Sequence, residues 1–169
     1  MRVVFVHGKE SGPNGLKIKA MSAVVQALGY EVVAPDLRQH DDPQWRTQQL
    51  LEVLGSGPAF IVGSSLGGFV AANAAALAPQ QVLGLFLLCP AFDLPGYPLK
   101  RPDQPLRGGQ VYLVHGRRDS VVPLANSERA ASDWAATLVI VDDDHPLHNS
   151  VDLICQHLHV WLSQQEPLA

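Results

Sequence analysis

The most informative segment of the sequence is residues 63–67, which read Gly-Ser-Ser-Leu-Gly and are followed by a further glycine. They fit the pattern G-x-S-x-G with Ser65 at its centre, and they lie between an apolar run that predicts a strand and an Ala-rich run that predicts a helix. Such a turn exposes the serine hydroxyl at a helix N-terminus, where free N–H groups favour developing negative charge. The flanking glycines are needed because larger residues would clash in so tight a turn. The pattern therefore predicts a nucleophilic serine.

Other interpretations of this segment are weaker but stay open. Ser64 is a poor rival for Ser65, because centring the pattern on Ser64 would put Val62 where a glycine is needed. The stretch is also compatible with an ordinary turn between strand and helix, or with a phosphate-binding loop. The G-K-[ST] sequence of a phosphate-binding loop does not follow, which disfavours that interpretation.

A serine needs a base to remove its proton and a third group to orient that base. In a parallel sheet these groups belong at the carboxyl ends of strands, where ligands gather. Asp119 comes just after the apolar run 111–114, and His145 comes just after the run 138–141. We therefore predict Ser65 as nucleophile, His145 as base and Asp119 as the acid that holds the imidazole.

Three alternatives involve neighbouring residues. His148 is the rival base, although His145 is favoured because it directly follows a strand while His148 would already lie in a helical turn. Asp93, after the fourth predicted strand, is an alternative acid. Residues 142–144, all aspartates, resemble a metal cluster together with the two histidines, but nothing in their spacing fixes a ligand number or geometry. We expect neither a metal nor an organic cofactor.

Other polar and sulfur-containing residues have plainer interpretations. His7 and His115 each precede a glycine at a strand end, and we expect them to shape those turns through hydrogen bonds. Cys89 ends a predicted strand and is expected to be a buried apolar residue, since no turn of the nucleophile type surrounds it.

Short apolar runs alternate with longer amphipathic ones along the whole chain. Strands are predicted at Val3–Val6, Glu31–Ala34, Ala59–Val62, Leu85–Leu88, Val111–Val114 and Leu138–Val141. Helices are predicted at Leu16–Leu28, Trp45–Leu54, Leu66–Leu77, Ser127–Trp134 and Leu147–Trp161. Most strands are continuously apolar, as expected when helices cover both faces of a sheet. The alternation predicts an α/β fold with a parallel sheet, and the stretch Pro90–Gly109 reads as one long loop.

Composition limits the class of protein. A length of 169 residues suggests one domain, residues 1–169, and a content of 47% hydrophobic and 17% charged residues excludes a disordered chain. The formal net charge of −4 argues against nucleic acid or an anionic membrane as partner. No apolar run approaches the roughly 20 residues that span a bilayer, and two cysteines are too few for a disulfide framework. We expect a cytoplasmic protein.

The sequence resembles the α/β-hydrolase superfamily, and in particular its small bacterial members without a lid. The segments that carry the resemblance are residues 6–8 (Val-His-Gly), 33–38 (Val-Ala-Pro-Asp-Leu-Arg), 63–67, 115–119 (His-Gly-Arg-Arg-Asp) and 121–123 (Val-Val-Pro). The chain order Ser65, Asp119, His145 is also that of the superfamily. The resemblance implies a three-layer sandwich around a six-stranded parallel sheet of order 2-1-3-4-5-6, with no cap domain. It further implies an oxyanion hole formed by the backbone N–H groups of Leu66 and Lys9, with Glu10 as the alternative second donor.

These features together predict a serine hydrolase, most simply a carboxylesterase for small or medium esters or thioesters. The expected partner is a small-molecule substrate. Two other functions stay open: a catalytically silent binding protein on the same fold, or haloperoxidase- or lyase-type chemistry without a cofactor that uses the same three residues. Fold alone does not choose among them.

Overall fold

The six predicted strands form one parallel sheet in the computed structural model, which describes residues 1–97 and 110–165. The order is β2-β1-β3-β4-β5-β6, as the resemblance implied. The strands are β1 (Arg2–Val6), β2 (Glu31–Val33), β3 (Ala59–Ser64), β4 (Val82–Leu88), β5 (Val111–Gly116) and β6 (Thr137–Val141). All neighbouring pairs are parallel, so every strand delivers its carboxyl end to the same edge.

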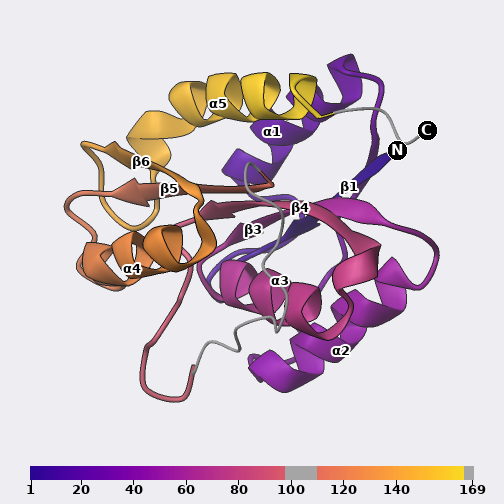
Figure 1. Ribbon diagram of the computed structural model, residues 1–169, viewed down its shortest axis with the longest axis horizontal. Coiled ribbons are helices and arrows are strands. Elements are labelled where there is room, and N and C mark those ends of the chain that lie inside the picture. Colours follow the sequence, from indigo (N-terminus) through magenta and orange to yellow (C-terminus); the bar gives the residue numbers. More distant parts are fainter. Residues whose placement is uncertain (98–109, 166–169) are drawn as a thin grey trace.

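Helices cover both faces of this sheet and make the predicted three layers (Figure 1). The helices are α1 (Leu16–Ala27), α2 (Pro43–Leu54), α3 (Leu66–Leu77), α4 (Leu124–Trp134) and α5 (Val151–Ser163), with short 3₁₀ turns at Pro79–Gln81 and His148–Ser150. Helices α1 and α5 lie together on one face, and α2, α3 and α4 lie on the other. The fold class predicted from the sequence is therefore confirmed.

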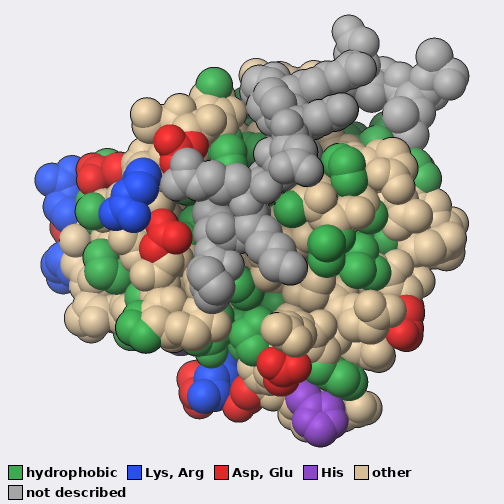
Figure 2. Space-filling view, turned by 60° about the horizontal axis from the view of Figure 1, so that its bottom comes forward, with side chains coloured by type: hydrophobic (Ala, Val, Ile, Leu, Met, Phe, Trp, Pro, Cys, Tyr) green, Lys and Arg blue, Asp and Glu red, His purple; other side chains and the backbone are tan. Residues whose placement is uncertain are grey.

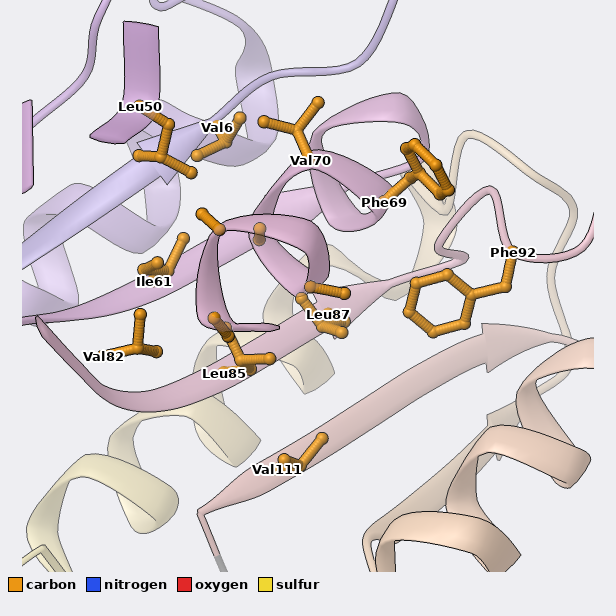
Figure 3. Close-up of a cluster of buried hydrophobic side chains, with 14 of the residues drawn as sticks. Val6, Leu50, Ile61, Phe69, Val70, Val82, Leu85, Leu87, Phe92 and Val111 are labelled. Carbon is orange, nitrogen blue, oxygen red and sulfur yellow. The ribbon is translucent and has the colours of Figure 1, made fainter. Parts of the chain in front are cut away.

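The continuous apolar runs are explained by burial on both faces. In β1, Val4 and Val6 belong to the core under α2 and α3, whereas Val3 and Phe5 belong to the core under α1 and α5. These four side chains are at most 1% exposed. Figure 3 shows the first of the two cores, where side chains of the sheet meet those of α2 and α3. Because alternate residues face opposite layers, both faces of β1 bury apolar side chains, which explains its continuous apolar run.

The last helix differs from its prediction. The apolar spacing predicted a helix from Leu147, but α5 begins at Val151 and a 3₁₀ turn precedes it. Leu147 itself is in the left-handed region, with φ of 57°, and cannot belong to a right-handed helix. Its side chain is fully buried, so Leu147 fits the apolar spacing of the helix although its backbone is not helical. Most other elements extend their predicted ranges by a few residues; β2 and α1 each end one residue earlier than predicted.

The connection between β4 and β5 spans only residues 89–110. Within its described part, Leu94 and Tyr97 form an isolated antiparallel bridge, and no cap domain stands there. The rest of the predicted Pro90–Gly109 loop, and the end of the chain from residue 166, lie outside the described residues. On the face viewed in Figure 2, acidic and basic side chains lie next to one another toward one side, with small hydrophobic groups scattered between polar ones. No described helix is both long and apolar enough to cross a membrane.

Candidate active site

Ser65 occupies a strained turn between β3 and α3. Its backbone angles are φ 52° and ψ −117°, a conformation that non-glycine residues rarely adopt. The turn leaves no room for side chains beside it: a Cβ at Gly63 would lie 2.6 Å from the carbonyl oxygen of Gly67, and one at Gly67 would lie 2.0 Å from that of Val6. The two glycines of the pattern are thus required by backbone contacts, and Ser65 stands half-buried at the start of α3.

Asp119 lies in the loop after β5, with both carboxylate oxygens engaged. Oδ1 accepts hydrogen bonds from the backbone N–H groups of Val121 and Val122, each at 2.8 Å, and Oδ2 accepts one from Nδ1 of His145 at 2.7 Å. The carboxylate is fully buried. Burial alone would raise its pKa, but the two amides and the imidazole outweigh that effect and lower the pKa below the ordinary value. Asp119 is therefore an anion with a fixed orientation.

His145 follows β6 and joins the other two residues. Because Nδ1 donates to Asp119, Nε2 carries the lone pair, and it accepts a hydrogen bond from Ser65 Oγ at 2.9 Å. The structure thus brings together three residues from the ends of β3, β5 and β6 in one hydrogen-bonded chain. With Nδ1 bound to Asp119, Nε2 faces the Ser65 hydroxyl, which is the geometry in which an imidazole can take a proton from serine.

The loop that carries His145 is built around the buried side chain of Asp143. Its carboxylate accepts hydrogen bonds from Ser150 Oγ at 2.8 Å, from the amide N–H of Asp144 at 2.9 Å, and from the backbone and side-chain N–H groups of Asn149 at 3.0 and 3.2 Å. Burial opposes its charge, but these donors lower its pKa overall. Asp143 therefore organises the loop from within, a role that a run of three aspartates in the sequence did not reveal.

A second imidazole supports Asp119 from behind. His115, at the end of β5, is fully buried; its Nε2 donates to the carbonyl of Val122 at 3.0 Å and lies 3.2 Å from Asp119 Oδ2. Its Nδ1 accepts a hydrogen bond from Ser127 Oγ at 2.8 Å. Burial lowers the pKa of His115, so the ring is neutral and does not cancel the charge of Asp119. The sequence predicted only that His115 shapes a turn; its contact with Asp119 required the tertiary structure.

Cys89, His115 and Asp119 also offer ligand-type atoms within 4.8 Å of one another. Burial raises the pKa of the Cys89 thiol, so it is protonated at neutral pH, and its sulfur already accepts the N–H of Gly116 at 3.4 Å. Metal binding here would have to displace the hydrogen bonds of both His115 and Asp119. The donor set is better explained as support for Asp119 than as a metal centre.

The rival residues have other positions. His148 is exposed in the 3₁₀ turn after His145, although it borders the same pocket. The carboxylate of Asp93 pairs with Arg129 at 3.2 Å. His7 fulfils its predicted role: its Nε2 accepts the N–H of Leu37 at 2.9 Å and its Nδ1 donates to the carbonyl of Gly8 at 2.8 Å, which orders the turn after β1.

A pocket of about 430 Å³ opens at Ser65 and His145. Its apolar wall comes from the helix start at Leu66 and from the segments after β4 and β5, and its polar wall comes from the loop after β1. The remaining lining residues are Gly8, Lys9, Glu10, Ser11, Lys17, Ser64, Ala91, Leu94, Tyr97, Val121, Pro146 and His148. The loop after β1 lies directly over the serine turn, because a Cβ at Gly8 would be 3.5 Å from that of Ser65.

The chain belongs to the alpha/beta hydrolase family, whose model matches residues 3–164. A crystal structure of a protein described as a hydrolase of the alpha/beta superfamily, from Xanthomonas campestris pv. campestris, is 30% identical. It superposes with a TM-score of 0.84 and covers 96% of this chain and 98% of its own. The superfamily resemblance that the sequence motifs suggested is therefore confirmed.

Two curated relatives have named activities. An esterase from Mycobacterium tuberculosis is 32% identical over 133 residues, which are 70% of this chain and 42% of that protein. A mitochondrial palmitoyl-protein thioesterase from mouse is 30% identical over 103 residues, which are 54% of this chain and 35% of that protein. This chain thus matches less than half the length of each of these relatives.

Proposed function

We propose that this protein is a serine hydrolase that cleaves carboxylic esters through an acyl-enzyme. One observation carries the proposal: the continuous hydrogen-bonded chain from Ser65 Oγ to His145 at 2.9 Å and from His145 to Asp119 at 2.7 Å, at the mouth of a pocket. A buried carboxylate, an imidazole oriented by it and a serine at the start of a helix are what nucleophilic acyl transfer needs.

The reaction divides into two similar halves. Ser65 Oγ attacks the ester carbonyl while His145 Nε2 takes the hydroxyl proton; the tetrahedral adduct collapses as His145 returns that proton to the departing alcohol. Water then loses a proton to His145 and attacks the acyl-serine, and collapse of the second adduct releases the acid and restores the Ser65 hydroxyl. Asp119 stays ionised throughout and stabilises the imidazolium that forms twice.

The oxyanion would be held by backbone amides. Leu66 contributes the first N–H as the opening residue of α3, and Lys9 contributes the second from the loop over the serine turn, with Glu10 as its alternative. Each such donor is worth about 3 kcal/mol of barrier. The close approach of Gly8 to Ser65 supports a donor from this loop.

The substrate is an ester with an acyl or alcohol group of small to medium size. A pocket of about 430 Å³ is at the small end of ligand sites, and most of its lining side chains beyond the reacting groups are apolar or neutral. The names of the curated relatives, an esterase and a thioesterase, favour the same acyl chemistry. Thioesters would follow the same steps with a thiol as leaving group.

The proposal is tested by labelling with a fluorophosphonate, which reacts only with activated serines, and by mapping the adduct with mass spectrometry. We expect one adduct on Ser65, which Ser65→Ala abolishes. His145→Ala should slow labelling and para-nitrophenyl butyrate hydrolysis by at least about a thousandfold, because the base is lost.

His148→Ala is the matched control, since it removes an imidazole from the same pocket that does not touch Ser65. We expect it to change the rate by less than about threefold. A folded wild-type protein that forms no adduct would contradict the mechanism and favour the silent binding protein. Turnover of a substrate without an acyl-enzyme would favour the haloperoxidase or lyase alternative.

A further inference from the structure

Lys17 places a positive charge in the wall of the Ser65 pocket. It projects from the first turn of α1, and its ammonium donates a hydrogen bond of 2.6 Å to the carbonyl of Pro146, the residue directly after His145. The ammonium therefore stands beside the loop that carries the base. An ammonium has three N–H donors, and among the described residues Pro146 is its one hydrogen-bond partner.

The other charges of the pocket do not neutralise Lys17. Lys9 is itself a cation, and Glu10 is the only carboxylate among the described residues that line the pocket; it is exposed, so water screens its charge. No carboxylate within the described ranges forms an ion pair with Lys17. Asp143 and Asp144 act on it only at longer range, and the carboxylate of Asp143 is occupied by donors of its own loop.

The position of Lys17 is costly without a partner. Burial lowers its pKa, more than the nearby carboxylates raise it, because the charged form is partly removed from water. The first turn of α1 adds a further penalty, since cations are disfavoured at a helix N-terminus and no acidic residue is present in that turn. A half-buried cation that borders a pocket and has donors to spare is suited to bind an anion.

Resting on the proposed function, we propose that the pocket selects esters that carry a second, ionised carboxylate, which Lys17 binds while Ser65 attacks the ester carbonyl. The apolar stem between the two groups would lie against Leu94, Tyr97 and Val121. Lys17 is then a specificity-determining residue, whereas the three residues of the hydrogen-bonded chain carry the chemistry on every ester.

The alternative is a purely structural role, in which the hydrogen bond from Lys17 to Pro146 links α1 to the His145 loop. The two roles differ in what a substitution does. Loss of a structural link would disturb His145 and lower kcat for every ester alike. Loss of an anion site would raise KM for charged esters and leave the KM and kcat of neutral esters unchanged.

The experiment compares two matched substrate pairs. One pair, mono-para-nitrophenyl adipate and para-nitrophenyl hexanoate, places the carboxylate on the acyl side. The other, para-butyryloxybenzoate and phenyl butyrate, places it on the alcohol side. In the wild-type protein we expect the charged member of at least one pair to have a kcat/KM about tenfold higher, and the pair that responds identifies the side.

Three variants test whether Lys17 causes the preference for charged esters. Lys17→Met should abolish it through KM while the neutral esters keep their kcat. Lys17→Arg, which keeps the charge, should retain most of it. Lys19→Met is the matched control and should leave the preference intact, because Lys19 is exposed on the same helix and does not line the pocket.

Hydrolysis of neutral esters by the wild type with no preference for a charged one overturns the inference alone, and so does a preference that survives in Lys17→Met. An equal loss of kcat/KM on charged and neutral esters in Lys17→Met also overturns the inference and shows that Lys17 has a structural role instead. A wild type that hydrolyses none of the four esters and takes no fluorophosphonate label overturns the proposed function itself.

Discussion

At the scale of single residues, the site depends on how the two oxygens of Asp119 are shared. One oxygen is held by two backbone amides, so the carboxylate cannot rotate; the other faces both His145 and His115. His115 is itself held in one tautomer by Ser127 and by the carbonyl of Val122. A neutral donor behind the carboxylate fixes its direction without neutralising its charge.

His115 can be tested by removing its polar atoms at nearly constant volume. In His115→Leu the carbonyl of Val122 and the hydroxyl of Ser127 lose a buried partner. We expect the free energy of unfolding to drop by about 2 kcal/mol and kcat on para-nitrophenyl butyrate to drop about tenfold, with KM little changed. His115→Gln, which keeps an N–H donor, should recover much of kcat. An unchanged kcat in a folded leucine variant would show that His115 does not position Asp119.

At the scale of elements, the serine turn requires α3 to pack directly against the backbone of the sheet. Every residue of α3 from Leu66 to Ala75 is buried, and glycine and alanine make up most of the helix, so its backbone can approach β1 and β3. A fully buried arginine, Arg46 of α2, supports the neighbouring loop: its Nε donates to the carbonyl of His40 at 2.7 Å, and its guanidinium pairs with Asp41 at 3.1 Å. Its Nη1 also donates to the carbonyls of His7 and Gly8, both at 3.4 Å, and so supports the start of the loop after β1 that lines the pocket.

Gly67 is the position where this close packing is most demanding. In Gly67→Ala the added methyl would overlap the backbone of β1, 2.0 Å from the carbonyl oxygen of Val6, and no side-chain movement relieves it. We expect a loss of at least about 3 kcal/mol in the free energy of unfolding, measured by urea denaturation. Gly15→Ala is the control: its methyl would meet ordinary contacts at 3.4 Å, so the change should stay under about 1 kcal/mol. Equal effects of the two would refute the packing argument.

At the scale of the whole molecule, two fully buried histidines make stability depend on pH. Burial lowers the pKa values of His7 and His115 below 6.5, so the folded protein keeps both rings neutral where the unfolded chain would protonate them. The stability they contribute is present above about pH 6.5 and is lost as the pH falls toward their folded pKa values. The lowered pKa values of Asp119 and Asp143 add a further loss below about pH 4.

The pH dependence can be measured by urea denaturation between about pH 7.5 and 5.5. As the pH falls over that range, protonation of His7 and His115 in the unfolded chain should reduce the free energy of unfolding by up to about 2.7 kcal/mol, or about 1.4 kcal/mol for each histidine. His115→Gln removes one of them and should roughly halve the slope. A wild-type stability that is constant over this range would contradict the assignment of both rings as neutral.

Much of this protein could be predicted from local patterns. Continuous apolar runs predicted a parallel sheet covered on both faces, because such strands are buried on both sides. The spacing of Gly63, Ser65 and Gly67 predicted the serine turn, because only glycine permits the backbone contacts that this turn makes. Asp119 and His145 were predicted from their places after strands, because parallel strands bring their carboxyl ends to one edge. These features depend on neighbours in the chain or on a simple rule of topology.

What only the tertiary structure decided is which side chains far apart in sequence share a proton or a charge. The contact of His115 with Asp119, the loop built on Asp143, and the placement of Lys17 beside Pro146 join segments from different elements. The late start of α5 has the same origin, since buried Leu147 keeps the apolar period while its backbone leaves the helix. Hydrogen bonds and burial depend on distances in space, and the spacing of residues along the sequence does not contain those distances.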